Sequence, residues 1–216
     1  VNHLEEVLAQ AVNVNIASGA SRARFVQMRG IGERGQFAEP LNASVGLQID
    51  GVDFSGIGTA ATLFDVSQIE VLRGPQGTLY GANALAGLIN VVTPASTIDW
   101  QSRAQFDLGN YGAQGVGAAI RGPLSDNVGV RFSARKYLDD GFIDNVFLPS
   151  KSTDNHDEST VRLKLDGRSA SLAWQLAAGV VDVANGYDAF SLDNNRQTRS
   201  DQPGADEQTS RYLSAR

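Results

Sequence analysis

The residues best suited to chemistry in this chain are few and scattered. Only two histidines occur, His3 and His156, and they lie far apart in the sequence. His156 belongs to the acidic run from Asp154 to Glu158, where imidazole and carboxylate groups either bind a divalent cation weakly or simply face water. The aspartates of the polar stretch 182–208 lack the spacing of a calcium-binding loop. The sequence therefore predicts no metal site and no bound cofactor.

Other catalytic and cofactor-binding patterns are missing from the sequence as well. No cysteine occurs, which excludes disulfides, thiolate metal sites and cysteine nucleophiles. Gly30-Ile31-Gly32 and Gly56-Ile57-Gly58 lack the third glycine and the strand-to-helix context of a dinucleotide-binding loop. Neither a Ser-His-Asp nor a paired-carboxylate arrangement is recognisable. A net charge of −6 gives no basic surface for nucleic acid. We predict no catalytic residues, no enzyme activity and no nucleic-acid partner.

Residues 1–95 mix helical and strand patterns, which predicts a small α+β domain. Apolar residues at helical spacing indicate a helix over 4–11, with Asn2 as the expected N-cap and Glu5 at the capping-box position. The other expected elements are strands at 12–16, 25–29, 45–52, 69–72 and 88–93, a short helix at 58–64, and loop tips at 30–36 and 53–58. The strand at 45–52 is expected to bend at Asp50-Gly51, a favoured turn pair.

From Trp100 onward the pattern changes to strict alternation of apolar and polar residues, so that each strand has one apolar and one polar face. In the segment 128–135, for example, Val130 and Phe132 share one face, and Arg131 shares the other with its polar neighbours. The alternating segments are 103–108, 114–121, 128–135, 161–166 and 169–180, followed by the start of a sixth at 211–213. Such segments are typical of transmembrane β-strands and equally of a soluble β-sandwich.

The connections between these segments differ in length. Those at 122–127 and 166–169 are short, whereas 138–157 and 182–208 are long and polar. Long loops at one end and short turns at the other are typical of outer-membrane barrels, with the long loops outside the cell. No apolar run reaches the ~20 residues of a transmembrane helix. Because about eight strands are needed to close a membrane barrel, we expect the chain to be a piece of a longer protein.

The most specific motif is the stretch of 26 residues from Gln68 to Thr93, which reads as a strand, a Gly-Pro break, a glycine-rich corner and a second strand. It resembles the signature near the end of the plug domain in TonB-dependent outer-membrane receptors. The strand from Phe25 to Gly30 resembles the family's hydrophobic-Arg-Gly strand, and Val45 to Val52 resembles its hydrophobic-Asp-Gly-Val strand. Where many members have Pro-Gly-Val, this chain departs from the family with Gln10-Ala11-Val12.

This resemblance implies an α+β plug domain at 1–95, followed at 100–216 by about five to six antiparallel β-strands of an incomplete transmembrane β-barrel. It implies a receptor in the bacterial outer membrane, surrounded by outer-membrane lipid, with the TonB energy-transducing complex and a small nutrient ligand as partners. The expected function is TonB-coupled uptake of a ferric siderophore, cobalamin, haem or a carbohydrate. The alternative is a soluble β-rich carbohydrate-active enzyme or binding module.

The resemblance also implies roles for three charged residues of the plug. Arg29 and Arg73 match the plug arginines that pair with barrel glutamates and lock the plug in place. Glu70, three residues before Arg73 on the same strand, is counted with this lock, and it either reaches a neighbouring strand or faces solvent. A guanidinium group suits this role because its planar fork binds a carboxylate through two hydrogen bonds. The alternative is that each arginine ends its strand and meets solvent.

Two further groups of residues follow from the same resemblance. The outward-pointing loops of the family contact ligand, and the candidates here are Glu33, Arg34, Gln36 and Phe54, with a solvated loop as the alternative for each. The glycines expected to permit tight turns or close backbone approach are Gly30, Gly51, Gly74, Gly81 and Gly87.

Overall fold

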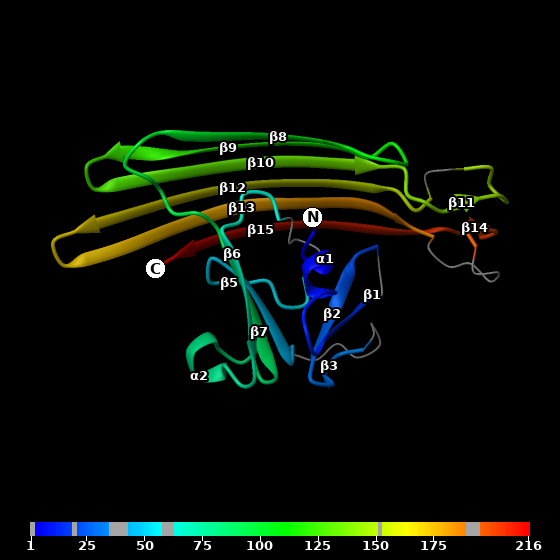
Figure 1. The fold of residues 1–216 in the computed structure, drawn as a ribbon, viewed down its shortest axis with the longest axis horizontal. Helices are drawn as coiled ribbons and strands as arrows, with labels where there is room; N and C mark the ends of the chain where they lie inside the picture. The colour runs from blue at the N-terminus through cyan, green and yellow to red at the C-terminus, as the bar shows by residue number, and fades with distance from the viewer. Residues whose placement is uncertain (1–2, 19–20, 35–42, 58–62, 151–152, 189–194) are drawn as a thin grey trace. The chain divides into compact units, whose positions relative to one another are not determined.

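The computed structural model describes residues 3–18, 21–34, 43–57, 63–150, 153–188 and 195–216. The chain forms two compact units, Val1–Pro94 and Ala95–Arg216. The first mixes short helices and strands, and the second is a β-sheet of long strands (Figure 1). Within the described residues, no helix has both the length and the hydropathy needed to cross a membrane.

The first unit begins with helix α1, Leu4–Leu8, which is shorter than the helix expected at 4–11. His3 caps it, because its Nδ1 accepts a hydrogen bond from the Glu5 N–H at 3.4 Å, and Glu6 completes the capping box. The expected cap, Asn2, lies outside the described residues. Three antiparallel strands follow in the order β1-β2-β3, with bounds Val14–Ser18, Ala23–Met28 and Ile31–Gly32.

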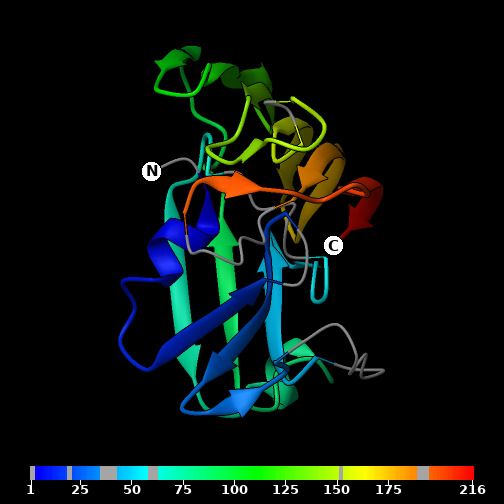
Figure 2. The ribbon, with the colours of Figure 1, turned by 90° about the vertical axis from the view of Figure 1, so that its right-hand side faces the viewer.

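The second sheet of this unit contains the motif that dominates the sequence. Its order is β5-β4-β7-β6, with bounds Val52–Asp53, Val45–Ile49, Gly87–Val92 and Gln68–Arg73. Figure 2 shows the neighbouring strands of this sheet running side by side. The glycine-rich corner between β6 and β7 contains a four-residue helix that the sequence did not predict, α2, Gly77–Tyr80. Residues 58–62 of the helix expected at 58–64 lie outside the described residues, and residues 63 and 64 are not helical.

Apolar side chains of both sheets make up the core of this unit. Met28 on β2, Ile49 on β4, and Leu88, Ile89 and Val91 on β7 are almost fully buried. Strand β7 is buried along most of its length because it pairs with β4 on one side and β6 on the other. A central strand of this kind is expected to read as a nearly continuous apolar run, as Leu88 to Val92 does.

The second unit is a six-stranded antiparallel sheet in the order β15-β13-β12-β10-β9-β8. Its strands are β8 Gln101–Leu108, β9 Gln114–Ser125, β10 Val128–Asp139, β12 His156–Ser169, β13 Leu172–Tyr187 and β15 Gly204–Ala215. Consecutive long strands therefore pair with each other, which makes the sheet a meander. Two-residue strands β11, Asp144–Asn145, and β14, Gln197–Thr198, form a separate parallel pair.

These strands are longer than the alternating segments of the sequence. Strand β10 continues to Asp139 and β12 starts at His156, so the connection expected at 138–157 is only 140–155. Strand β13 likewise extends to Tyr187 and β15 begins at Gly204. The strand expected at 161–166 was too short because its additional residues are mostly polar. The strand expected at 169–180 ended too early because the apolar residues change face there, from the exposed Val180 to the buried Val181 and Val183, which interrupts the alternation. At the other end, tight turns at 126–127 and 170–171 join the strands.

Candidate functional site

The six-stranded sheet has its polarity reversed relative to a water-soluble sheet. The apolar face predicted from the alternation is the exposed one, as Phe132 and Leu163 show with 41% of their surface accessible. The opposite face is charged and buried, and Arg131 is only 1% exposed. Other buried polar residues of this face are Ser133, Arg135, Glu158, Thr160, Arg162 and Lys164. A large exposed apolar face marks a surface that meets protein or lipid rather than water.

The strand register aligns these exposed apolar residues into rows across the sheet. Ile120 of β9 pairs with Phe132 of β10, which pairs with Leu163 of β12. Leu163 pairs in turn with Ala178 of β13, and Ala178 pairs with Leu213 of β15. Apolar rows of this kind make a continuous band, as on the lipid-facing surface of a transmembrane barrel.

The limit of this band on the side of the long connections runs obliquely across the strands. One row of paired residues is Val116, Lys136, Ser159, Asp182 and Thr209, on β9, β10, β12, β13 and β15. Toward the long connections, the exposed face becomes polar at Gln114 on β9, two positions beyond this row. On β10, β12 and β13 it becomes polar within the row itself, and on β15 it does so at Arg211, two positions before the row is reached. The limit of the band therefore shifts by four residues over four inter-strand spacings.

This shift gives the tilt of the strands relative to the band. Four residues correspond to about 13 Å along a strand, and four spacings to about 19 Å across the sheet. If the limit of the band is level with the membrane surface, the strands tilt by about 35°, the value typical of transmembrane barrels. At this limit Lys136 and Asp157 form an ion pair on the exposed face. Charged pairs of this kind fit the level where hydrocarbon gives way to head groups.

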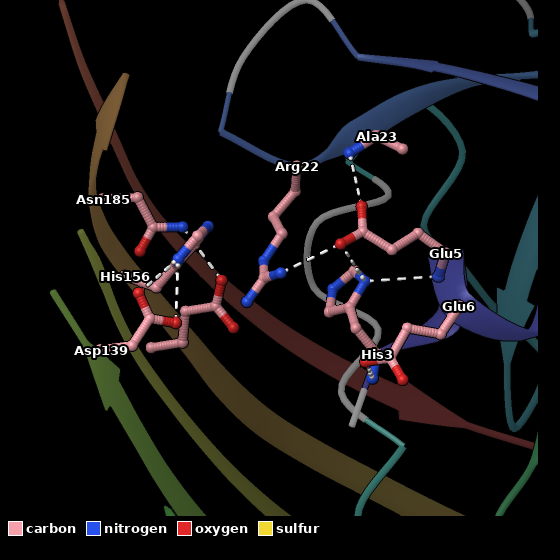
Figure 3. A network of polar contacts seen from close by, with 9 residues as sticks. His3, Glu5, Glu6, Arg22, Ala23, Asp139, His156 and Asn185 are labelled. Atoms are coloured by element: carbon pink, nitrogen blue, oxygen red, sulfur yellow. Dashed lines mark hydrogen bonds and ion pairs between the residues drawn. The ribbon is translucent and has the colours of Figure 1, made fainter. Parts of the chain in front are cut away.

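Beyond the band, polar contacts hold the strand ends and their long connections together. The His156 Nδ1 lies 2.9 Å from Asp139 Oδ1, a partner outside the acidic run that the sequence singled out (Figure 3). Asp154 of that run is buried, and burial raises the pKa of its carboxyl above the usual value. Within the described ranges, no group of three or more His, Asp or Glu side chains is placed to hold a metal ion.

The two long connections of the sheet are joined to each other. Strands β11 and β14 pair in parallel, and Asp188 accepts hydrogen bonds from Asn145 Nδ2 at 2.9 Å, Thr153 Oγ1 at 2.9 Å and Thr198 Oγ1 at 3.0 Å. Asn145, Asp188 and Thr198 are buried, so this contact is shielded from water. Arg196 also stacks over the Tyr111 ring of a third connection, 4.8 Å from its centroid. This pairing could not be predicted from the sequence, because its residues are polar and far apart in the chain.

In the first unit, Arg29 and Arg73 both contact one turn, residues 12 and 13. Arg29 does not end a strand as expected but is the first turn residue after β2, with φ 54°, followed by Gly30 with φ 81°. Its N–H donates to the Asn13 carbonyl at 3.0 Å, and Arg73 Nε donates to the Val12 carbonyl at 3.1 Å. Both side chains are exposed. The structure therefore brings the two predicted lock arginines to the same edge of the unit.

Glu70 has partners of its own within the second sheet. Its Oε2 accepts a hydrogen bond from Asn90 Nδ2 at 2.8 Å, across the β6–β7 pair, and its Oε1 accepts from Gln68 Nε2 at 2.9 Å. These contacts assign Glu70 to the sheet itself, which is one of the two alternatives that the sequence left open.

The four predicted ligand contacts differ in their surroundings. Glu33 Oε1 accepts from the Ser44 N–H at 2.9 Å and the Ser44 hydroxyl at 2.7 Å, so it fixes the start of β4. Arg34 is exposed, and Gln36 lies outside the described residues. Phe54 is only 3% exposed, which corrects the expectation that its side chain points out of a loop. It follows the β4–β5 hairpin and packs in the core, because an apolar ring gains free energy by burial.

The predicted glycines fall into two groups. Gly30, Gly51, Gly74 and Gly81 have positive φ angles. Gly51 follows Asp50, φ 49°, in the two-residue turn between β4 and β5, which is the hairpin geometry that an Asp-Gly pair favours. Gly87 differs, since a Cβ atom there would lie 2.2 Å from Met28 Sδ and 2.7 Å from the Leu72 carbonyl oxygen. It is required for close packing between strands.

One ion pair of the first unit was not anticipated. Glu5 lies in the first turn of α1 and accepts hydrogen bonds from Arg22 Nη1 at 3.0 Å and from the Ala23 N–H at 3.1 Å (Figure 3). It therefore ties the helix to the start of β2 instead of completing the capping box. Sequence spacing alone cannot reveal this, because the partners are 17 and 18 residues apart.

An α+β domain followed by an antiparallel meander with an exposed apolar face defines the plug-and-barrel class of membrane protein. Residues 1–88 match the family model described as TonB-dependent Receptor Plug Domain. Residues 1–88 therefore match the plug domain of TonB-dependent receptors, and the antiparallel strands that follow match the barrel strands of similar structures, as expected from the sequence. The family is one of receptors and transporters.

Individual proteins of the family show the same relationship. The pesticin receptor of Yersinia pestis is 45% identical over 82 residues, which is 37% of this chain and 12% of that protein. The ferric yersiniabactin uptake receptor of Yersinia pestis matches with a TM-score of 0.70 and 22% identity, over 91% of this chain and 32% of that structure. The ferripyoverdine receptor of Pseudomonas aeruginosa matches with a TM-score of 0.72 and 18% identity, over 100% of this chain and 29% of that structure. The chain thus spans about a third or less of these relatives.

Proposed function

We propose that this chain is the plug and the first barrel strands of a receptor in the bacterial outer membrane that takes up a scarce nutrient by TonB-coupled transport. The observation that carries the proposal is the reversed polarity of the six-stranded sheet, directly after a plug domain. An exposed apolar band on tilted strands fits lipid, and a charged, buried face fits a polar lumen that a removable plug must seal. The proposal includes no enzymatic step.

A ferric siderophore is the cargo class that the comparisons favour. Two of the similar structures are named as receptors for ferric yersiniabactin and for ferripyoverdine. These matches share the fold at low identity, so cobalamin, haem and carbohydrate stay as outcomes of the test. Glu33, Arg34 and Gln36 remain the proposed ligand contacts of the plug. Phe54 no longer belongs to this set because its ring is buried.

The test uses the full-length receptor in a host that lacks its own ferric-siderophore receptors. We expect uptake of a radiolabelled ferric siderophore that requires both the receptor and TonB. Uptake of cobalamin or haem, and not of any ferric siderophore, would reassign the cargo. A full-length product that remains in the aqueous fraction without detergent would contradict the membrane receptor and favour the soluble β-rich alternative.

We also propose that Arg29 and Arg73 lock the plug through glutamates of the barrel. What supports this is that Arg29, through its backbone N–H, and Arg73, through its Nε, both contact the turn at residues 12 and 13, and that both side chains are exposed. Replacing both by lysine keeps the charge but removes bidentate pairing, and we expect a higher conductance of the receptor in planar bilayers. If Arg29 is replaced alone, glycine is the better replacement, because the backbone φ of 54° at position 29 strains most residues other than glycine. Conductance equal to wild type in the double variant would refute the lock.

A further inference from the structure

Two tryptophans of the second unit each lie over a glycine of the neighbouring strand. A Cβ atom at Gly122 of β9 would lie 2.4 Å from Cδ2 and 2.6 Å from Cε3 of Trp100. A Cβ atom at Gly167 of β12 would lie 2.4 Å from both Cε2 and Cζ2 of Trp174. Ring atoms therefore fill the space that a side chain would need, and only glycine lets each indole rest directly on the strand.

The strand register places both tryptophan–glycine pairs on the exposed apolar face of the sheet. Gly122 pairs with Val130 of β10, and Gly167 pairs with Val128 of the same strand. Val128 and Val130 share the face of the exposed Phe132, because side chains alternate between the two faces of a strand. Both rings therefore lie on the face that the proposed function assigns to lipid.

The two pairs also lie at one level of the apolar band. Gln114 on β9 and Asp182 on β13 mark its limit on the side of the long connections, and Gly122 and Trp174 each lie eight positions from that limit along their strand. The row of paired residues through Gly122 reaches Leu176 on β13, two positions short of Trp174. Pairing alone thus does not give the equal distance. The level of the rings runs parallel to the polar limit.

The distance between the two levels gives the thickness of the band. Eight residues are about 26 Å of strand, or about 22 Å of depth at a tilt of about 35°. The hydrocarbon core of a typical bilayer is about 30 Å thick, and the apolar band of outer-membrane barrels is about 25 Å tall. The band of this sheet therefore matches a thin hydrocarbon layer.

An indole ring suits the edge of such a layer. Its body is apolar, whereas its N–H needs a hydrogen-bond acceptor, so tryptophan gathers where hydrocarbon meets the polar part of the lipid. The first acceptors at that depth of a phospholipid leaflet are the ester carbonyls. The opposite limit differs in chemistry, since Lys136 and Asp157 form an ion pair there.

We propose that Trp100 and Trp174, each seated on its glycine, anchor the turn end of the sheet in the ester-carbonyl layer of phospholipids, so that the receptor matches a hydrocarbon thickness of about 22 Å. The glycine seats keep each ring against the strand, which holds the indole N–H at one depth. This inference rests on the proposed membrane function and adds to it the lipid layer that these residues bind.

The test uses the full-length receptor in phosphatidylcholine vesicles that carry a nitroxide label either near the head group or near the end of the acyl chain. The fluorescence of each ring is the difference between wild type and Trp100→Phe or Trp174→Phe. We expect the head-group label to quench both rings more strongly than the deep label, and to the same extent, because the rings lie at one level. Stronger quenching by the deep label, or unequal quenching of the two rings, would overturn the anchor.

The glycine seats are tested in the same vesicles, with each variant as the control for the other. Gly122→Val should abolish the preference for the head-group label at Trp100 and leave Trp174 unchanged, because valine lifts only the ring above it. Gly167→Val should have the converse effect. If both rings keep their preference in both variants, the glycines are not seats for the tryptophans.

The thickness is measured separately, by denaturant unfolding in vesicles of dilauroyl and of dioleoyl phosphatidylcholine. A band of about 22 Å fits the shorter chains, so the unfolding midpoint should be higher in dilauroyl vesicles, and the reverse order would overturn the thickness. Quenching of both rings by aqueous iodide and by neither lipid label would instead refute the membrane receptor itself. Rings quenched best by the deep label would overturn the anchor alone, since the protein would still lie in the membrane.

Discussion

A single arginine on the exposed apolar face distinguishes a membrane barrel from a soluble sheet. Leu163 lies in the middle of the apolar residues of β12, and the register places it between Phe132 and Ala178. If this face meets lipid, Leu163→Arg puts a charge near the middle of the hydrocarbon layer, which costs about 2–4 kcal/mol. If the face meets water, an exposed Leu→Arg change stays within about 0.5 kcal/mol.

The same substitution at Leu172 is the matched control. Leu172 lies next to the turn at 170–171, six residues before Ala178 on β13, and Ala178 pairs with Leu163. Six residues are about 20 Å of strand, or about 15 Å of depth at a tilt of about 35°. Since the apolar band of such barrels is about 25 Å tall, Leu172 falls at its edge, where arginine costs about 0–1 kcal/mol.

The assay is denaturant unfolding of the full-length receptor in phospholipid vesicles, which gives a free energy of unfolding for each variant. We expect Leu163→Arg to lose at least about 2 kcal/mol and Leu172→Arg to lose about 1 kcal/mol or less. Equal and small losses at both positions would refute the assignment of this face to lipid. Equal and large losses would refute the tilt that places Leu172 at the edge.

Two other predictions concern packing and pH. Gly87→Ala should destabilise the plug by about 1–3 kcal/mol, because the new Cβ atom would overlap Met28. The control is Gly77→Ala in α2, which meets no atom within 4 Å and should be neutral or slightly stabilising. Thermal unfolding of the two variants measures the difference. Burial raises the pKa of Asp154 above its ordinary 3.8, so its neutral form is favoured in the folded state. The contribution of Asp154 to stability should therefore grow as pH falls through that raised pKa and be lost as pH rises. Hydrogen exchange of residues 153–155 between pH 7 and 4 tests this expectation. Asp154→Asn should remove the pH dependence of the local stability.

The sequence predicted the fold well where local chemistry decides it. Alternation predicted five of the long strands and the start of the sixth, and the Asp50-Gly51 pair predicted its hairpin because both residues tolerate positive φ. Alternation cannot tell which face is buried, since a soluble sheet and a lipid-facing sheet read alike. The end of β13 was missed because its apolar residues change from one face to the other between Val180 and Val181, which breaks the period that the alternation relies on.

The residues of the candidate site were harder to place for a different reason. The pattern placed Arg29 at the end of a strand, whereas the structure has it in the turn that follows, because a strand residue and a turn residue look the same in the sequence until φ is known. Phe54 looked like a loop residue because it follows a turn, and only its packing shows that it is buried. The hydrogen bond from the Ser96 hydroxyl to Asp166 spans 70 residues, and no local rule connects two polar groups at that separation.

The parallel pair β11–β14 sets an order of assembly for the sheet. It joins Asp144 to Gln197 and Asn145 to Thr198, and the whole of β12 and β13 lies between them in the chain. Closing so long a loop costs entropy that only later contacts repay. The neighbouring hairpins can zip up one after another, each from a nearby turn. We therefore expect the β11–β14 pair to form last, after β12 and β13 have already paired in their final register.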